Sequence, residues 1–98
     1  MNTHEKTDAL QAAMLKNIAD FEANRISLGL LASNLDILIS NATMPKIEKK
    51  ILEKLWGGLE DTSALMADEC RTEMRAEEHK VVTAILDQLK SQIMISIS

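Results

Sequence analysis

Cysteine, proline, glycine and aromatic side chains are all scarce in this 98-residue sequence, which holds one Cys, one Pro, three Gly and two aromatic residues. A single cysteine excludes an internal disulfide framework and a multi-cysteine zinc site, and it fits a reducing compartment. A protein built of strands needs many turns, and this sequence has few of the glycines and prolines that form them; tyrosine, which is common in strands, is absent. The composition therefore favours an all-α fold.

An excess of positive charge and long apolar runs are missing as well. The chain has 11 Lys plus Arg against 15 Asp plus Glu, for a net charge of −4, and its pI is near 5.1. This balance argues against nucleic-acid binding, which needs clustered cations. No uncharged run approaches the ~18 residues of a membrane span, and residues 1–8 are polar, without the apolar core of a signal peptide. We expect a cytoplasmic protein that binds neither nucleic acid nor membrane.

Apolar residues recur every three or four positions, which is the period of an amphipathic helix. A first helix is predicted from Asp8 to Ala23, with Asp8 and Gln11 as an approximate capping box and residues 1–7 disordered. Ser27 can cap a second helix, which extends to Ala42 and carries the most continuous apolar stripe.

Pro45 disfavours helical geometry just before it and fits the first position of a third helix. Gly57 and Gly58 weaken that helix, so we expect a kink or a short break there, with helix on both sides. Cys70 continues the apolar phase and is interpreted as a buried structural thiol.

A last helix is marked by the stripe Val82, Ile85, Leu86, Leu89 and Ile93, although its start within residues 71–79 has no visible signal. The sequence therefore predicts one domain over residues 1–98, an all-α bundle of four to five helices.

Residues with the spacing of a catalytic, metal or cofactor site are not found. His4 and His79 form no His-Glu-x-x-His pattern, and Gly57-Gly58 lies in no phosphate-binding motif. Three arginines, Arg25, Arg71 and Arg75, do not reproduce the inward cations of chorismate mutases, which are small helical enzymes. We therefore expect no enzyme activity, no cofactor and no metal.

Charge is distributed unevenly along the chain. Residues 57–79 hold seven carboxylates against two arginines, a net charge of −5. Such a cluster is tolerated on a solvated helix face, or it serves as an electrostatic docking face for a basic partner. The candidate docking residues are Glu60, Asp61, Asp68, Glu69, Glu73, Glu77 and Glu78.

The opposite charge gathers earlier on the third predicted helix. Its lysines are interleaved with Glu48 and Glu53, and no aromatic side chains are present for base stacking. We interpret this face as solvated. The lysines are Lys46, Lys49, Lys50 and Lys54.

Two stretches that cover about half of the chain carry a family resemblance. The first is Phe21-Glu22 followed by Ile26-Ser27-Leu28, Leu31, Leu35, Leu38 and Ile39, and the second is Trp56-Gly57-Gly58-Leu59-Glu60 with Ala64 and Ala67. They resemble small helical immunity proteins of bacterial contact-dependent growth inhibition systems. The resemblance implies a cytoplasmic inhibitor that binds the C-terminal domain of one cognate toxin tightly, and many of those toxins are nucleases.

A nuclease cleft is basic because it holds phosphates, so an acidic segment is physically suited to occupy it. A different interpretation is a structural or regulatory module that self-associates, with the apolar stretch from Ile93 to Ile97 feeding a homodimer interface. An enzyme is the third alternative, although no residue constellation supports it.

Overall fold

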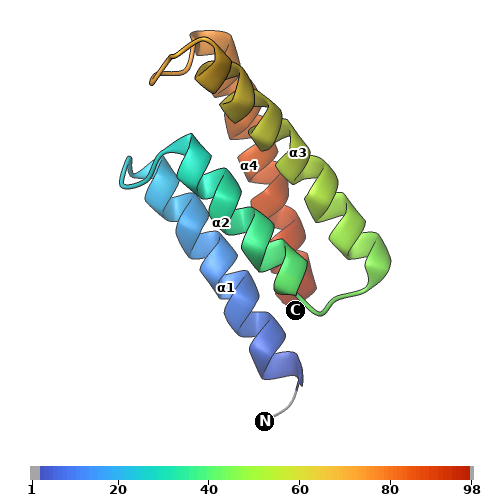
Figure 1. Cartoon of the computed structure of the whole chain (residues 1–98). Helices are drawn as coiled ribbons and strands as arrows, with labels where there is room; N and C mark the ends of the chain where they lie inside the picture. The colour runs from blue at the N-terminus through green and yellow to red at the C-terminus, as the bar shows by residue number, and fades with distance from the viewer. Residues whose placement is uncertain (1–2, 98) are drawn as a thin grey trace.

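Four helices make up the described part of the protein and confirm the all-α prediction. The computed structural model describes residues 3–97, and it describes the side chains of residues 9–95. The helices are α1 (Thr3–Glu22), α2 (Leu28–Asn41), α3 (Lys46–Asp68) and α4 (Ala76–Ile97), and no strand occurs within the described range. Figure 1 shows two helical hairpins, α1–α2 and α3–α4, lying side by side. Each helix packs against its two neighbours around the bundle, α1 on α2, α2 on α3, α3 on α4 and α4 on α1.

The core lies between the four helices and follows the predicted stripes. Side chains spaced three or four apart on each helix converge there, as the helical period requires. Ile93, proposed from sequence as part of a dimer interface, is fully buried in this core instead. The buried apolar cluster is Met14, Ile18, Leu28, Leu31, Leu35, Ile39, Ala42, Leu52, Leu59, Met66, Val82, Leu86, Leu89 and Ile93.

Polar contacts join the two hairpins in addition to the core. The indole Nε1 of Trp56 on α3 donates to the Ala32 carbonyl of α2 at 2.7 Å, which gives the half-buried ring the partner that its N–H needs. Lys90 on α4 pairs with Glu22 on α1 at 3.0 Å. These contacts fix how the two hairpins lie against each other.

The start of α1 and the middle of α3 differ from the sequence prediction. Helix α1 begins at Thr3, so residues 3–7, predicted to be disordered, are helical, while residues 1 and 2 lie outside the described part. Gln11 is therefore no capping residue, and its side chain is fully buried. Helix α3 continues through Gly57 and Gly58, so the predicted break is wrong. Continuity is favoured because Gly58 lies against Ile85 of α4, where packing compensates the low helix propensity.

Helix ends are set by local backbone hydrogen bonds. The Ser27 hydroxyl accepts from the Leu30 N–H at 3.2 Å, which confirms the predicted cap of α2. Pro45 lies one residue before α3, at the cap position, and not at the first helical position.

Helix α3 ends in a left-handed turn at Cys70. The Arg71 N–H donates to the Met66 carbonyl, the Cys70 N–H donates to the Ala67 carbonyl, and Cys70 has φ 54°. This is the Schellman arrangement, which places the residue after the cap at positive φ on the surface. The prediction of a buried thiol is therefore wrong, and Cys70 is exposed.

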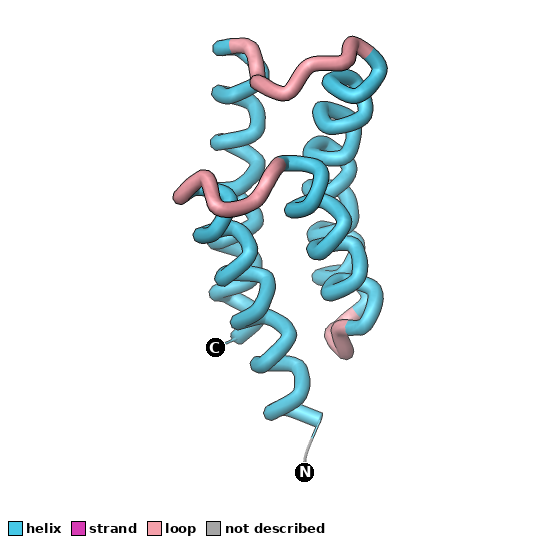
Figure 2. The backbone as a smooth tube through the Cα atoms, turned by 60° about the vertical axis from the view of Figure 1, so that its left-hand side comes forward, coloured by secondary structure: helices cyan, strands magenta, loops and turns pink. Residues whose placement is uncertain are grey.

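The α3–α4 hairpin extends further than the α1–α2 hairpin at the end of the bundle where each hairpin turns. In Figures 1 and 2 the α3–α4 hairpin extends beyond the α1–α2 turn, so its connecting loop stands above that turn. This loop, residues 69–75, is called the α3–α4 loop below. The step between the two turns positions the candidate site.

Candidate functional site

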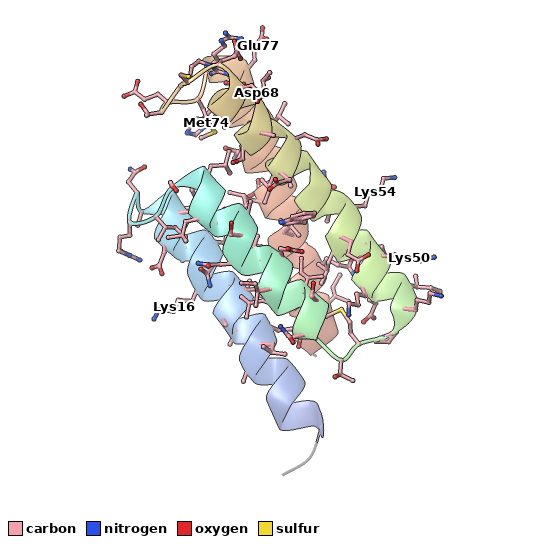
Figure 3. The ribbon with its side chains drawn as sticks, in the orientation of Figure 1. Lys16, Lys50, Lys54, Asp68, Met74 and Glu77 are labelled. Atoms are coloured by element: carbon pink, nitrogen blue, oxygen red, sulfur yellow. The ribbon has the colours of Figure 1, made fainter. Side chains whose placement is uncertain are left out.

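The predicted acidic residues lie on one hairpin. Glu60, Asp61 and Asp68 are on α3, Glu69 and Glu73 are in the α3–α4 loop, and Glu77 and Glu78 are in the first turn of α4. Figure 3 shows Asp68 and Glu77 close to the same end of the bundle. Asp61 lies seven residues before Asp68, or about 10 Å along the helix at ~1.5 Å per residue. The structure therefore divides the predicted face into an end group, Asp68 to Glu78, and a pair two turns away, Glu60 and Asp61.

Arg71 neutralises part of the end group. Its guanidinium binds both carboxylate oxygens of Glu78, Nη1 to Oε1 at 2.6 Å and Nη2 to Oε2 at 2.7 Å. Nη2 also contacts Glu69 at 3.0 Å, and Glu69 accepts from Arg75 at 2.9 Å. Two arginines and two carboxylates thus form a charge-balanced network that fastens the loop to the first turn of α4.

Glu78 has a structural role in addition. Its carboxylate accepts the backbone N–H of Arg75 at 2.8 Å, three residues before it, which caps the start of α4. The hydrogen bond from the Arg71 side chain, and then the backbone hydrogen bond at Arg75, lower the pKa of Glu78 from 4.5 to about 2. The same guanidinium holds the pKa of Glu69 below its ordinary value, and the Glu78 carboxylate raises the pKa of Arg71. These two carboxylates are therefore committed to the loop and are not free for a partner.

The remaining five acids carry the charge that a partner meets. Glu60, Asp61, Asp68, Glu73 and Glu77 are exposed, and none of them forms an ion pair within the described residues. Because the arginine network balances its own charge, these five account for the full net −5 of residues 57–79. Three of them lie at the α3–α4 loop: Asp68 is just before it, Glu73 is within it and Glu77 is just after it.

A groove of about 620 Å³ lies in the step between the α1–α2 turn and this loop. Its apolar lining comes from all four helices and both turns, and Glu22, Glu73 and His79 are the titratable residues that line it. The exposed His79 ring faces the Thr83 hydroxyl at 3.4 Å. The groove thus joins an apolar surface to the acidic end group. Its apolar lining residues are Phe21, Ile26, Leu28, Met66, Met74 and Leu86.

The groove was missed from sequence, although two signals for it exist. Phe21 and Ile26 flank the chain reversal at Asn24, which has φ 62° and ends α1. Met74 is the one large apolar residue in the polar segment 71–79, and Figure 3 shows it below the loop, facing the α1–α2 turn. A large apolar residue in a polar loop indicates that its side chain packs on another part of the protein, but only the fold shows which part.

Metal-site and membrane-span patterns were also sought in the part of the chain that the structure describes. Within the described residues no cluster of His, Cys, Asp and Glu has the arrangement of a metal site. No described helix has the length and apolar character needed to cross a bilayer. No family model matches this sequence, and comparisons with curated proteins and with solved structures likewise give no match.

Proposed function

We propose that this chain is an immunity protein that binds a secreted bacterial toxin, a nuclease with a basic catalytic domain, and neutralises it in a 1:1 complex inside the cytoplasm. One observation carries the proposal. Three carboxylates that form no ion pair within the described residues, Asp68, Glu73 and Glu77, lie at the α3–α4 loop beside an apolar groove. The resemblance of the Phe21–Ile39 and Trp56–Ala67 stretches to immunity proteins supports it.

The electrostatics suit a basic partner. A nuclease cleft lined by Lys and Arg attracts an acidic surface over a distance comparable to the Debye length, about 8 Å at physiological salt. Such complementarity raises the association rate and rejects partners of the wrong charge. The apolar groove supplies contact area that slows dissociation, since affinity differences reside mostly in the dissociation rate.

The Arg71 network gives the surface its rigidity. The side chains of Arg71 and Glu78 are 19% and 14% exposed, so their bidentate pair is partly shielded from solvent. A loop that is already ordered loses less conformational entropy on binding. The docking residues are therefore Asp68, Glu73 and Glu77, with Glu60 and Asp61 extending the surface along α3, while Glu69 and Glu78 hold the loop.

The test is protection against the toxin together with binding kinetics. A tagged full-length chain captures its partner from the source bacterium, and the captured toxin domain is then expressed alone to confirm that it is toxic and basic. Co-expression of the wild-type chain restores growth. The double variant E73K/E77K is expected to associate at least ten-fold more slowly at low salt and to lose protection, because two attractive charges become repulsive.

A matched control isolates the site from total charge. Asp36 and Glu53 are exposed on α2 and α3, away from the loop, and D36K/E53K changes the net charge by the same amount. This variant is expected to protect as the wild type does. Full protection by E73K/E77K with unchanged kinetics contradicts the docking site, and failure of the wild-type chain to neutralise any captured toxin contradicts the function.

A further inference from the structure

Helix α3 carries a charge pattern that is symmetric about one glycine. Lys46, Lys50, Lys54, Gly57, Asp61, Ala64 and Asp68 follow one another at intervals of three or four residues, so they form one stripe along the helix. Residues at matching distances on either side of Gly57 form pairs. The distance is 11 residues for Lys46 and Asp68, seven for Lys50 and Ala64, and three and four for Lys54 and Asp61. The stripe is thus basic in one half and acidic in the other.

This stripe is exposed along its length. Its lysines and aspartates are accessible, and none of them forms an ion pair within the described residues. A Cβ built on Gly57 meets no atom within 4 Å, so the centre of the stripe is open to an approaching surface. Figure 3 shows Lys50 and Lys54 projecting from the N-terminal half of α3 and Asp68 near its other end.

The order of charges opposes the stability of the isolated helix. A helix favours anions at its N-terminus and cations at its C-terminus. Near its start, helix α3 has Lys46, Lys49 and Lys50 against the single acid Glu48, and at its other end it has Asp68 and no basic residue in the last turn. Because this order of charges destabilises the isolated helix, we expect the charges to take part in another contact.

Exposed apolar side chains accompany the stripe along the seam between α3 and α4. Gly58 of α3 contacts Ile85 of α4, which fixes the register of these antiparallel helices. Ile47 and Leu65 on α3, and Val81 and Ile95 on α4, are spaced to flank this contact, and they are 76%, 47%, 53% and 64% exposed. The seam therefore presents a mixed face with apolar residues towards both ends.

We propose that this α3–α4 face binds a second copy of the same chain, with a two-fold axis that crosses α3 at Gly57. The two α3 helices then run antiparallel, and each half meets its opposite. Lys54 of one copy faces Asp61 of the other, Lys46 faces Asp68, and Lys50 reaches over the small Ala64. A two-fold interface uses the same patch on both copies, so a self-complementary stripe is what it requires.

Charge also decides between the two possible axes. With the axis parallel to α3, α3 of one copy lies on α4 of the other at the same level. Asp68 then approaches Glu77, and the lysines of α3 meet the C-terminal half of α4, where the described part has no acid beyond Asp87. Only the axis across α3 places Lys46 and Lys54 of one copy opposite Asp68 and Asp61 of the other.

The size of the face is adequate for a reversible dimer. Helix α3 has 23 residues, and at ~1.5 Å per residue and a helix spacing of ~9 Å the pair presents a face on the order of 600 Å². Standard stable interfaces bury ~800 Å² per partner, so the dimer is expected at the weaker end of the specific range.

Self-association is measured by sedimentation equilibrium of the full chain over a concentration series. Wild type is expected to form dimers. The single variants K54E and D61K each place like charges opposite one another twice, so each is expected to raise the dissociation constant roughly ten-fold or more. Circular dichroism checks that the helix content of these surface variants is unchanged.

The decisive sample is an equimolar mixture of K54E and D61K. Each contact across the axis then joins opposite charges again, so the mixture is expected to dimerise although neither variant does so alone. K16E, which reverses an exposed lysine on α1, is the control and should dimerise as wild type does. A wild type that stays monomeric up to about 1 mM, or a mixture that stays monomeric, overturns the proposal. Because Asp61 and Asp68 belong to both surfaces, toxin binding is tested with E73K/E77K, which changes no stripe residue, and self-association is tested with K54E and with the mixture of K54E and D61K.

Discussion

Replacement of Gln11 by methionine is expected to stabilise the fold. Gln11 lies on the inner stripe of α1 with Met14 and Ile18, and its side chain is fully buried. Neither its amide nitrogen nor its amide oxygen has a hydrogen-bond partner within the described part of the chain. Each unsatisfied buried polar group costs about 1–3 kcal/mol relative to its hydrated state in the unfolded chain.

Methionine has nearly the length and shape of glutamine and no polar group that must be satisfied, so the packing is conserved while the penalty is removed. We expect Q11M to raise the free energy of unfolding by about 2 kcal/mol. For a domain of this size such a change raises Tm by on the order of 10 °C.

Urea and thermal unfolding followed by circular dichroism measure both quantities. Q88M, on the exposed surface of α4, is the control for the residue type itself and should change stability by less than about 0.5 kcal/mol. If Q11M leaves stability unchanged or lowers it, the amide is satisfied in solution and the reasoning is refuted.

Three further predictions concern the backbone and the arginine network. Gly57→Ala should raise the free energy of unfolding by about 1 kcal/mol because its Cβ meets open space. Gly58→Ala should raise it less because its Cβ would lie 2.6 Å from the side chain of Ile85 on α4, and urea unfolding compares the two variants. Cys70→Gly should stabilise by about 0.5–1 kcal/mol by relieving the positive φ, and Cys70→Ala, which keeps that strain, should not. Because the folded pKa of Glu78 is about 2 and its ordinary value is 4.5, wild-type stability should fall as pH drops from about 4.5 towards 2; E78Q should show a flatter profile in that window when urea midpoints are measured across pH.

The sequence predicted the helices well because the apolar period is a local property. The stripe from Leu28 to Ile39, its Ser27 cap and the break at Pro45 all follow from neighbouring residues. The hydrogen bond from the Trp56 indole to the Ala32 carbonyl joins residues 24 positions apart, so no local pattern shows it. The start of α1 was placed too late, since residues 3–7 carry few of the apolar side chains on which the prediction depended.

The candidate site was predicted only in part. The count of acids in residues 57–79 is a fact of the sequence, and their concentration near the α3–α4 loop followed from it. The sequence could not show which of these acids form ion pairs. Arg71 pairs with Glu69 and Glu78 because the turn at Cys70 places its side chain beside them, although Glu78 is seven residues further along the chain. Periodicity extrapolated through that turn placed Cys70 in the core, since a pattern of spacing does not show where a helix ends.

By itself, therefore, the sequence determined the helical class, the Ser27 cap of α2, the break at Pro45 and the core stripes, because each depends on residues within a few turns of one another. The tertiary structure alone decided the continuity of α3 through its glycines, the burial of Gln11, the pairing of Arg71 with Glu78 and the groove beneath the α3–α4 loop. The physical reason is the same in each case. These features depend on which helix surfaces face each other across the bundle and on how far one hairpin extends beyond the other. Neither property can be predicted from the spacing of residues within one helix.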